Sequence, residues 1–195
     1  MTSHHSTTPD LSHLAVPNSF FADRPLVTAD GKPITADDRF ALLDLVHSFE
    51  WCLVSRHKDA FMKLFTDDVV FDHGIGYARG KQEAVDLAWQ VPFYGLRHHF
   101  ANQVPYIDDQ GRLAMLSHVF VIQVDSEQPI SQTLPIVLDQ GVVHWVFQKQ
   151  ADHWKVAEFV FDQQKLAAFS GAPASMIHAM AQTSEQRAAD RANAH

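Results

Sequence analysis

Apolar and polar positions follow a helical period in the first part of the chain and a strand period in the second. Between residues 35 and 55, apolar side chains recur every three or four positions, which predicts one long helix. Thr35 and the acidic residues after it mark the start of this helix. A threonine hydroxyl can accept a first-turn N–H, and negative charge favours the positive end of a helix.

This helix has two apolar stripes on its surface. The first is formed by Leu42, Leu45, Val46, Phe49 and Leu53, and the second by Phe40, Leu43, His47, Trp51 and Val54. A helix that is apolar nearly all round is a buried one, so we expect both stripes to be covered. We expect this helix to plug the mouth of a curved sheet.

Shorter elements follow the long helix, and strands dominate the rest of the chain. The pattern predicts helices over 58–65 and 81–90, with a strand over 69–73 and a turn at Gly74 and Gly76 between them. The period of two from Leu96 onward predicts strands over 97–107, 112–124, 133–149 and 153–163, with turns at 109–111 and 151–152. Pro129 and Pro135 interrupt the third of these runs, so we expect it to begin as an edge strand or a loop. Helices followed by antiparallel strands predict an α+β fold with the helices on one face of a bent sheet.

The chain divides into three parts. Residues 1–34 contain four prolines and an Asp30-Gly31 turn signal, which predicts an extended arm whose apolar spots, 20–21 and 26–27, lie against the domain or a neighbour. Residues 35–165 form the predicted domain. Residues 166–195 are alanine-rich and polar, which predicts a C-terminal helix or a flexible tail.

Composition and charge narrow the class of protein. The chain has 195 residues, and 23 acidic side chains against 15 basic ones give a net charge of −8, which argues against a nucleic-acid partner. No apolar stretch is long enough to cross a membrane, and the N-terminus does not resemble a signal peptide. The single cysteine, Cys52, rules out an internal disulfide. These features together favour a cytoplasmic protein.

Four segments resemble the SnoaL-like branch of the nuclear transport factor 2 superfamily. They are LFTDDVVFD at 64–72, GIGYARG at 74–80, RHHFAN at 97–102 and WKVAE at 154–158, and they occur in the family's order over about residues 36–165. The resemblance implies a cone-shaped, curved antiparallel sheet, an α+β barrel, with N-terminal helices packed over its concave face. Residues 74–91 are most similar to the scytalone dehydratase and lindane dehydrochlorinase branch.

The resemblance also implies a His–Asp pair that removes a proton from the substrate. Counting back from the motif at 64–68 places the family's helix aspartate at Val54 and its helix tyrosine at Phe49. A valine does not orient an imidazole, so another residue must do this work or the pocket only binds.

Histidines are the candidate bases, because imidazole titrates near neutral pH. Side chains alternate along a strand, so one of His98 and His99 points into the barrel, and the pattern leaves both open. Phe100, Asn102 and Val104 share a face with His98. The base needs a partner that orients it or that protonates the leaving group. The candidate partners are Asp72, Glu50 or another histidine such as His118. The predicted substrate-binding residues are His47, Phe49, Trp51, Val54, Tyr94, Asn102 and His144.

We expect no metal and no cofactor. A three-histidine site built from His73, His98, His118 and His144 is an alternative, but no HxH or HExxH motif supports it. The leading hypothesis is a cofactor-independent lyase, of the dehydratase, dehydrohalogenase or deformylase type, that acts on a small hydrophobic, aromatic or cyclic substrate. The alternatives are a non-catalytic ligand-binding protein or the small subunit of a ring-hydroxylating dioxygenase, and an isomerase or polyketide cyclase. Barrels of this kind are often homodimers or homotrimers, and we expect the same here.

Overall fold

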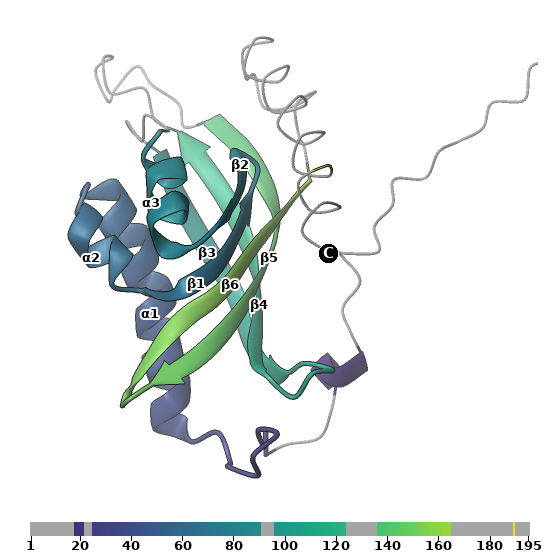
Figure 1. The fold of residues 1–195 in the computed structure, drawn as a ribbon. Helices are drawn as coiled ribbons and strands as arrows, with labels where there is room; N and C mark the ends of the chain where they lie inside the picture. The colour runs from purple at the N-terminus through teal and green to yellow at the C-terminus, as the bar shows by residue number, and fades with distance from the viewer. Residues whose placement is uncertain (1–17, 22–24, 91–95, 124–135, 165–188, 190–195) are drawn as a thin grey trace, which may run out of the picture.

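The computed structural model describes residues 18–21, 25–90, 96–123, 136–164 and 189. Its helices are η1 (Asn18–Phe21), α1 (Ala36–Val54), α2 (Lys58–Met62) and α3 (Lys81–Trp89). Its strands are β1 (Phe65–His73), β2 (Gly76–Arg79), β3 (Leu96–Ile107), β4 (Leu113–Gln123), β5 (Ile136–Gln150) and β6 (His153–Gln164). The predicted α+β class is confirmed, with three α-helices ahead of the long strands (Figure 1).

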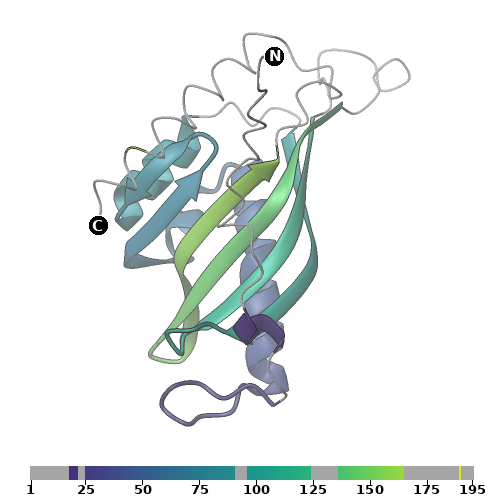
Figure 2. The ribbon, with the colours of Figure 1, turned by 90° about the vertical axis from the view of Figure 1, so that its right-hand side faces the viewer.

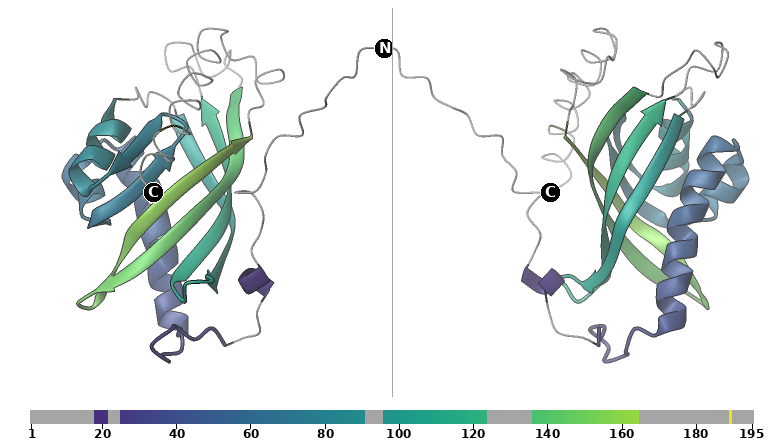
Figure 3. Two further views of the ribbon diagram at one scale, coloured as in Figure 1. Left: turned by 45° about the vertical axis from the view of Figure 1, so that its right-hand side comes forward. Right: turned by 180° about the vertical axis from the view of Figure 1, so that it is seen from behind.

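The six strands form one curved sheet in the order β2-β1-β6-β5-β4-β3. Neighbours are antiparallel except β1 and β6, which run parallel. The sheet is open, with β2 and β3 at its edges, and it curves around α1 (Figure 1). Viewed from behind, α1 lies beside the edge strand β3 (Figure 3). The sequence therefore predicted the curved sheet and its helix layer, but not the parallel pairing of β1 with β6.

Helix α1 begins as predicted. The Thr35 hydroxyl accepts the Asp38 N–H at 3.1 Å, and the Asp38 carboxylate accepts the Thr35 N–H at 3.1 Å, which completes a capping box. Asp38 also accepts hydrogen bonds from Trp154 Nε1 and Lys149 Nζ. The same carboxylate therefore ties the start of α1 to the β5–β6 hairpin.

Only the first of the two predicted apolar stripes is buried. Leu42, Leu45, Val46, Phe49 and Leu53 face the sheet. The expectation that the second stripe is also covered was wrong, because Phe40, His47 and Trp51 are exposed. One layer of sheet contacts one side of a helix, so a second apolar stripe needs another partner or remains in water.

Three details near β1 differ from the prediction made from the sequence. Helix α2 is shorter than predicted, and β1 begins at Phe65 rather than Val69. Strand β2 was missed, because its four residues are too few to display a period of two.

Pro129 and Pro135 lie outside the described residues, as do most of residues 1–34 and 166–195, so the three-part division of the chain stays a prediction.

The described part of the N-terminal arm contacts two sides of the domain. Leu26 and Ile34 are buried in the main core, and Gly31, with φ of 79°, turns the chain between them. Phe20 of η1 packs edge-on against Tyr106 at a centroid distance of 5.5 Å. Figure 2 shows η1 in front of the convex face of the sheet, with α1 behind it. Among the described residues, no helix is both long and apolar enough to cross a membrane.

Candidate functional site

Strand β3 separates the two adjacent histidines. His98 is 8% exposed and pairs with the buried Val121 of β4, whereas His99 is exposed and pairs with Phe120, which is 41% exposed. Residues opposite each other on neighbouring strands share a face of the sheet. His98 therefore points to the concave side, and the question that the alternation left open is settled in its favour.

Glu50 of α1 holds His98 by two atoms. One carboxylate oxygen accepts the backbone N–H of His98 at 2.8 Å, and the other lies 2.9 Å from its Nδ1. The side chains of His98 and Glu50 are only 6% and 14% exposed. Because the acceptor is a carboxylate, this contact favours the tautomer with the proton on Nδ1, so that Nε2 is the basic nitrogen.

Glu50 makes the carboxylate contact for which the resemblance pointed to the position of Val54. The two residues are four positions apart, which places them one turn apart on the same side of α1. Both line the groove between α1 and β3. A glutamate one turn earlier on the helix therefore supplies the carboxylate. The sequence offered Glu50 as a possible partner but gave no reason to prefer it.

The interior of the cone is nearly filled by rings. Phe71, His73 and Phe159 stack on one another, and Phe49 stacks on Phe159. His73 lies near His98, at a centroid distance of 6.4 Å, and its Nδ1 accepts the Ile75 N–H. The remaining cavity has a volume of about 10 Å³, which is room for about one water molecule. Among the described residues, this interior cavity is therefore too small to hold a ligand.

A larger space lies on the other side of His98. It is a groove of about 430 Å³ between α1 and the edge strand β3. Its walls are His47, Glu50, Trp51, Val54, Arg97, His98, His99 and Phe100. His98 and Phe100 line both this groove and the interior cavity. The Glu50–His98 pair thus lies in the wall between the two.

Asn102 and His118 do not join this site. Asn102 has a positive φ of 53° at an irregularity in β3, where Ala101 pairs with His118 but Val104 already pairs with Leu116. This bulge changes which residues face inward, so the predicted shared face of His98, Asn102 and Val104 is broken. Asn102 Nδ2 contacts His118 Nδ1 at 3.1 Å, and both side chains are exposed.

Asp72 and His144 lie on the convex side. Asp72 pairs with Val160, and Val160 pairs with His144, so the three form one row across β1, β6 and β5. Phe71 and His73, the neighbours of Asp72, face the concave side instead. Asp72 is buried, but it lies on the face of the sheet opposite to His98. Burial lowers the pKa of His144 and raises the pKa of the neighbouring Tyr106 to about 12.

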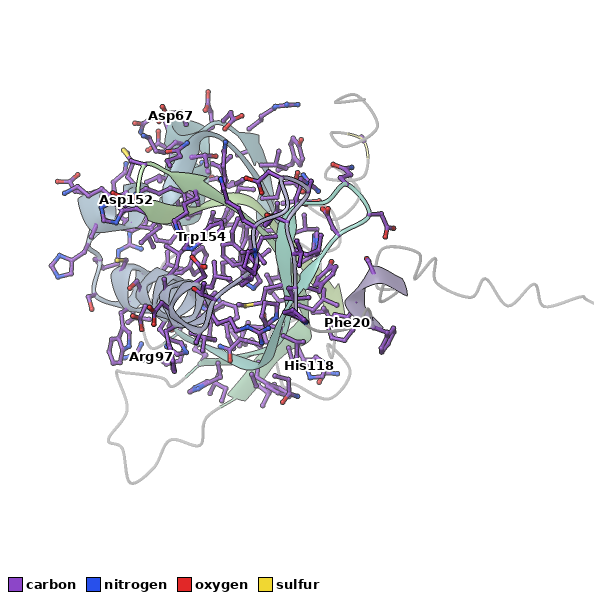
Figure 4. All side chains as sticks on the ribbon, turned by 90° about the horizontal axis from the view of Figure 1, so that it is seen from below. Phe20, Asp67, Arg97, His118, Asp152 and Trp154 are labelled. Atoms are coloured by element: carbon purple, nitrogen blue, oxygen red, sulfur yellow. The ribbon has the colours of Figure 1, made fainter. Side chains whose placement is uncertain are left out.

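Figure 4 shows Arg97, the neighbour of His98 in the chain, at the side of α1, and His118 on the side of Phe20. The four histidines of the alternative metal site are divided between two faces, His73 and His98 inside and His118 and His144 outside. No cluster of metal-binding side chains is found among the described residues. Of the predicted binding residues, His47, Trp51 and Val54 line the groove, Phe49 lies in the core, and Tyr94 is outside the described residues.

The comparisons with known proteins agree with this architecture. The profile of the SnoaL-like domain matches residues 35–160. The chain belongs to the SnoaL-like family. The resemblance drawn from the four segments is thereby confirmed, including its place in the nuclear transport factor 2-like superfamily. A comparison with curated proteins finds no match.

Solved structures similar to this SnoaL-like chain include a protein of unknown function from Mycobacterium tuberculosis, with a TM-score of 0.60 and 12% identity over 78% of this chain and 98% of that one. A candidate scytalone dehydratase from Novosphingobium aromaticivorans has a TM-score of 0.55 and 15% identity over 66% and 85%. LinA, a lindane dehydrochlorinase, has a TM-score of 0.54 and 20% identity over 70% and 95%. At these identities the similarity shows a common fold, and this fold hosts both enzymes and proteins of unknown function.

Proposed function

We propose that this SnoaL-like protein is a lyase of the dehydratase or dehydrohalogenase type, in which His98 is the general base and Glu50 positions it. The observation that carries the proposal is the double contact of one Glu50 carboxylate with the backbone N–H and Nδ1 of His98. A carboxylate at Nδ1 fixes the ring and stabilises the imidazolium that forms when Nε2 takes a proton.

The reaction is an elimination. Nε2 of His98 takes a proton from a substrate carbon, and the electron pair of that C–H bond forms a C=C bond. The bond to the leaving group on the adjacent carbon breaks, and the group departs as halide, or as water once it has received a proton. The proton on His98 then passes to solvent or to the departing hydroxide.

Two features of the chain support this role for His98 over the other candidates. His98 has a carboxylate partner and lies in the wall of a ligand-sized groove, whereas His118 lies on the outer face and contacts Asn102. Solved structures with this fold include a candidate scytalone dehydratase and LinA, a lindane dehydrochlorinase, and dehydration and dehydrochlorination are both eliminations.

The test is turnover of a panel of β-substituted aryl compounds by the wild type, His98→Gln and His118→Gln. Since a general base contributes about 10²–10⁴-fold to a rate, His98→Gln should lower kcat by about 100-fold or more. His118→Gln is the matched control, because it makes the same change on the convex face, and its kcat should be unchanged. Equal turnover by His98→Gln and the wild type would remove the mechanism.

A second function is ligand binding without turnover, and the small volume of the interior favours it. A cavity of about 10 Å³ cannot enclose a substrate away from water, as many lyases require. Tight binding of a panel compound in the groove, with no product from any compound, would favour this function.

An isomerase or cyclase would use the same base and is distinguished by its product. A homodimer or homotrimer is also proposed, and its mass in solution is measured by light scattering.

A further inference from the structure

The groove between α1 and β3 differs from the cone interior in size. Its volume of about 430 Å³ lies within the range of about 300–1,000 Å³ typical of small-molecule sites. The interior, at about 10 Å³, is far below the roughly 150 Å³ of a cavity that takes up benzene. Both spaces reach His98. A ring-sized ligand that approaches His98 in this conformation therefore enters from the groove.

One wall of the groove is an exposed indole. Trp51 is 69% exposed, although it is a large apolar side chain on a helix whose opposite side is fully packed. Phe100 of β3 lines the groove across from α1. Two aromatic side chains from different elements therefore line the same groove, which suits a planar ring, since stacked or edge-on aromatic pairs are favourable.

The charged side chains around the groove favour a ligand that carries an acid group. Among the described side chains that line it, Arg97 is the only one with a permanent positive charge, and Glu50 is the only carboxylate. Glu50 is already held against His98, whereas Arg97 is exposed and donates one Nη1–H to the Leu96 carbonyl at 2.7 Å. A guanidinium has five N–H donors in a fork that matches a carboxylate, so this bond leaves the capacity for a bidentate contact.

We infer that the groove binds a planar aromatic compound bearing a carboxylate, with the ring against Trp51 and the acid group at Arg97. This places the ring beside His98 and deepens the proposed function, on which its catalytic meaning rests. His47 and His99 lie at the same groove and add imidazole N–H donors near the acid group.

The experiment is an NMR titration of ¹⁵N-labelled protein with two probes, trans-cinnamate and its uncharged isostere cinnamamide. Cinnamate should shift the Trp51 indole N–H and the Arg97 Nε–H, with the Trp51 signal assigned from Trp51→Phe. It should bind about fivefold or more tightly than cinnamamide, because a charge-assisted hydrogen bond exceeds a neutral one. Arg97→Gln should abolish this preference, and Trp51→Ala should weaken both probes about fivefold.

Arg79→Gln is the matched control, because Arg79 is an exposed arginine of β2 that lines a different cavity. It should leave both affinities unchanged. Equal binding of the two probes, no binding of cinnamate up to its solubility, or shifts confined to the signals of Phe49 and Phe159 would overturn the inference.

His98→Gln separates this inference from the proposed function. If cinnamate still binds to this variant while turnover of the panel is lost, both stand. If turnover is retained and the Arg97-dependent preference remains, the base assignment fails and the aromatic-acid site stands. If turnover is lost but Arg97→Gln does not change the preference for cinnamate, the substrate class is wrong and the base assignment stands.

Discussion

The concave and convex faces of the sheet both carry histidines, but the surroundings of these histidines differ between the two faces. On the concave face His98 is held by a carboxylate and His73 packs against aromatic rings. On the convex face His118 is exposed and bonded to Asn102, and His144 is desolvated beside Tyr106. The difference shows that a histidine becomes a candidate base through the partner that orients it.

That partner comes from a distant part of the chain. Glu50 and His98 are separated by 48 positions and meet because α1 crosses the concave face beside β3. Nothing on the convex face performs this role for His118 or His144 among the described contacts. The predictions below test how differently the two faces behave.

The largest expected effect on stability comes from removing an aromatic ring from each face. Phe49→Ala should lower the free energy of unfolding by about 3–5 kcal/mol, because the ring is buried against Phe159 and Trp145. Phe20→Ala removes a partly buried ring from the convex face and should cost about 1 kcal/mol. Urea unfolding measures both. Similar losses in the two variants would contradict the distinction between a packed inner face and a thinly covered outer one.

The next effect concerns a buried polar contact on the concave face. Trp145 donates its Nε1–H to Ser117 Oγ at 2.9 Å, and both residues are buried. Ser117→Ala should cost about 1–3 kcal/mol because it leaves the indole N–H without this acceptor. In a double-mutant cycle with Trp145→Phe, the loss from Ser117→Ala should shrink, since Phe has no N–H to satisfy. Additive losses would show that the bond itself contributes little.

A smaller effect is expected where α1 is tied to the sheet. Burial alone would raise the pKa of Asp38, but hydrogen bonds from Thr35, Trp154 and Lys149 hold it well below its ordinary value. A depressed pKa contributes stability above the unfolded value of about 4 and loses it as the pH falls further. Asp38→Asn should therefore cost about 1 kcal/mol at pH 7. The gap from the wild type should narrow below about pH 4, as followed by thermal unfolding, and a constant gap would refute the electrostatic cause.

The smallest effect is the pH dependence due to His144. Burial lowers its pKa, against the opposing charge of Glu158, so the folded state favours the neutral ring. This contribution is complete above the unfolded pKa of about 6.5 and is lost as the pH falls through the lower, folded value. Replacing His144 by Leu should make unfolding less sensitive to pH between about 7 and 5. An unchanged slope in urea titrations at several pH values would show that His144 does not contribute.

The fold was largely readable from the sequence, because its signals are local. The capping residues at Thr35 and Asp38 and the period of two after Leu96 placed α1 and the long strands. Strand β2 was missed because it is defined by pairing with β1 rather than by its own pattern. The exposed stripe of α1 was misread for a similar reason, since the number of layers over a helix depends on elements far away in sequence.

Only part of the candidate site could be predicted from the sequence. Alternation showed that one of His98 and His99 faces inward, and the register of β3 against β4 decided which. The bulge at Asn102 reversed the faces beyond it, and no local signal marked it. Glu50 was obscured because the resemblance directed attention to Val54, one turn later. A glutamate reaches farther than an aspartate, so the carboxylate can move along the helix and still contact the same ring.

The most direct test of the central claim, that Glu50 and His98 act as one unit, is kcat for His98→Gln, Glu50→Gln and the double variant on one substrate that the wild type converts. Groups that act together are not additive. Glu50→Gln should lower kcat by about 100-fold or more with KM little changed, and the double variant should be no slower than His98→Gln alone. Asp44→Asn, an exposed acid on the same helix, should leave kcat unchanged. Wild-type kcat in Glu50→Gln, or a double variant slowed by the product of the two single losses, would contradict the account.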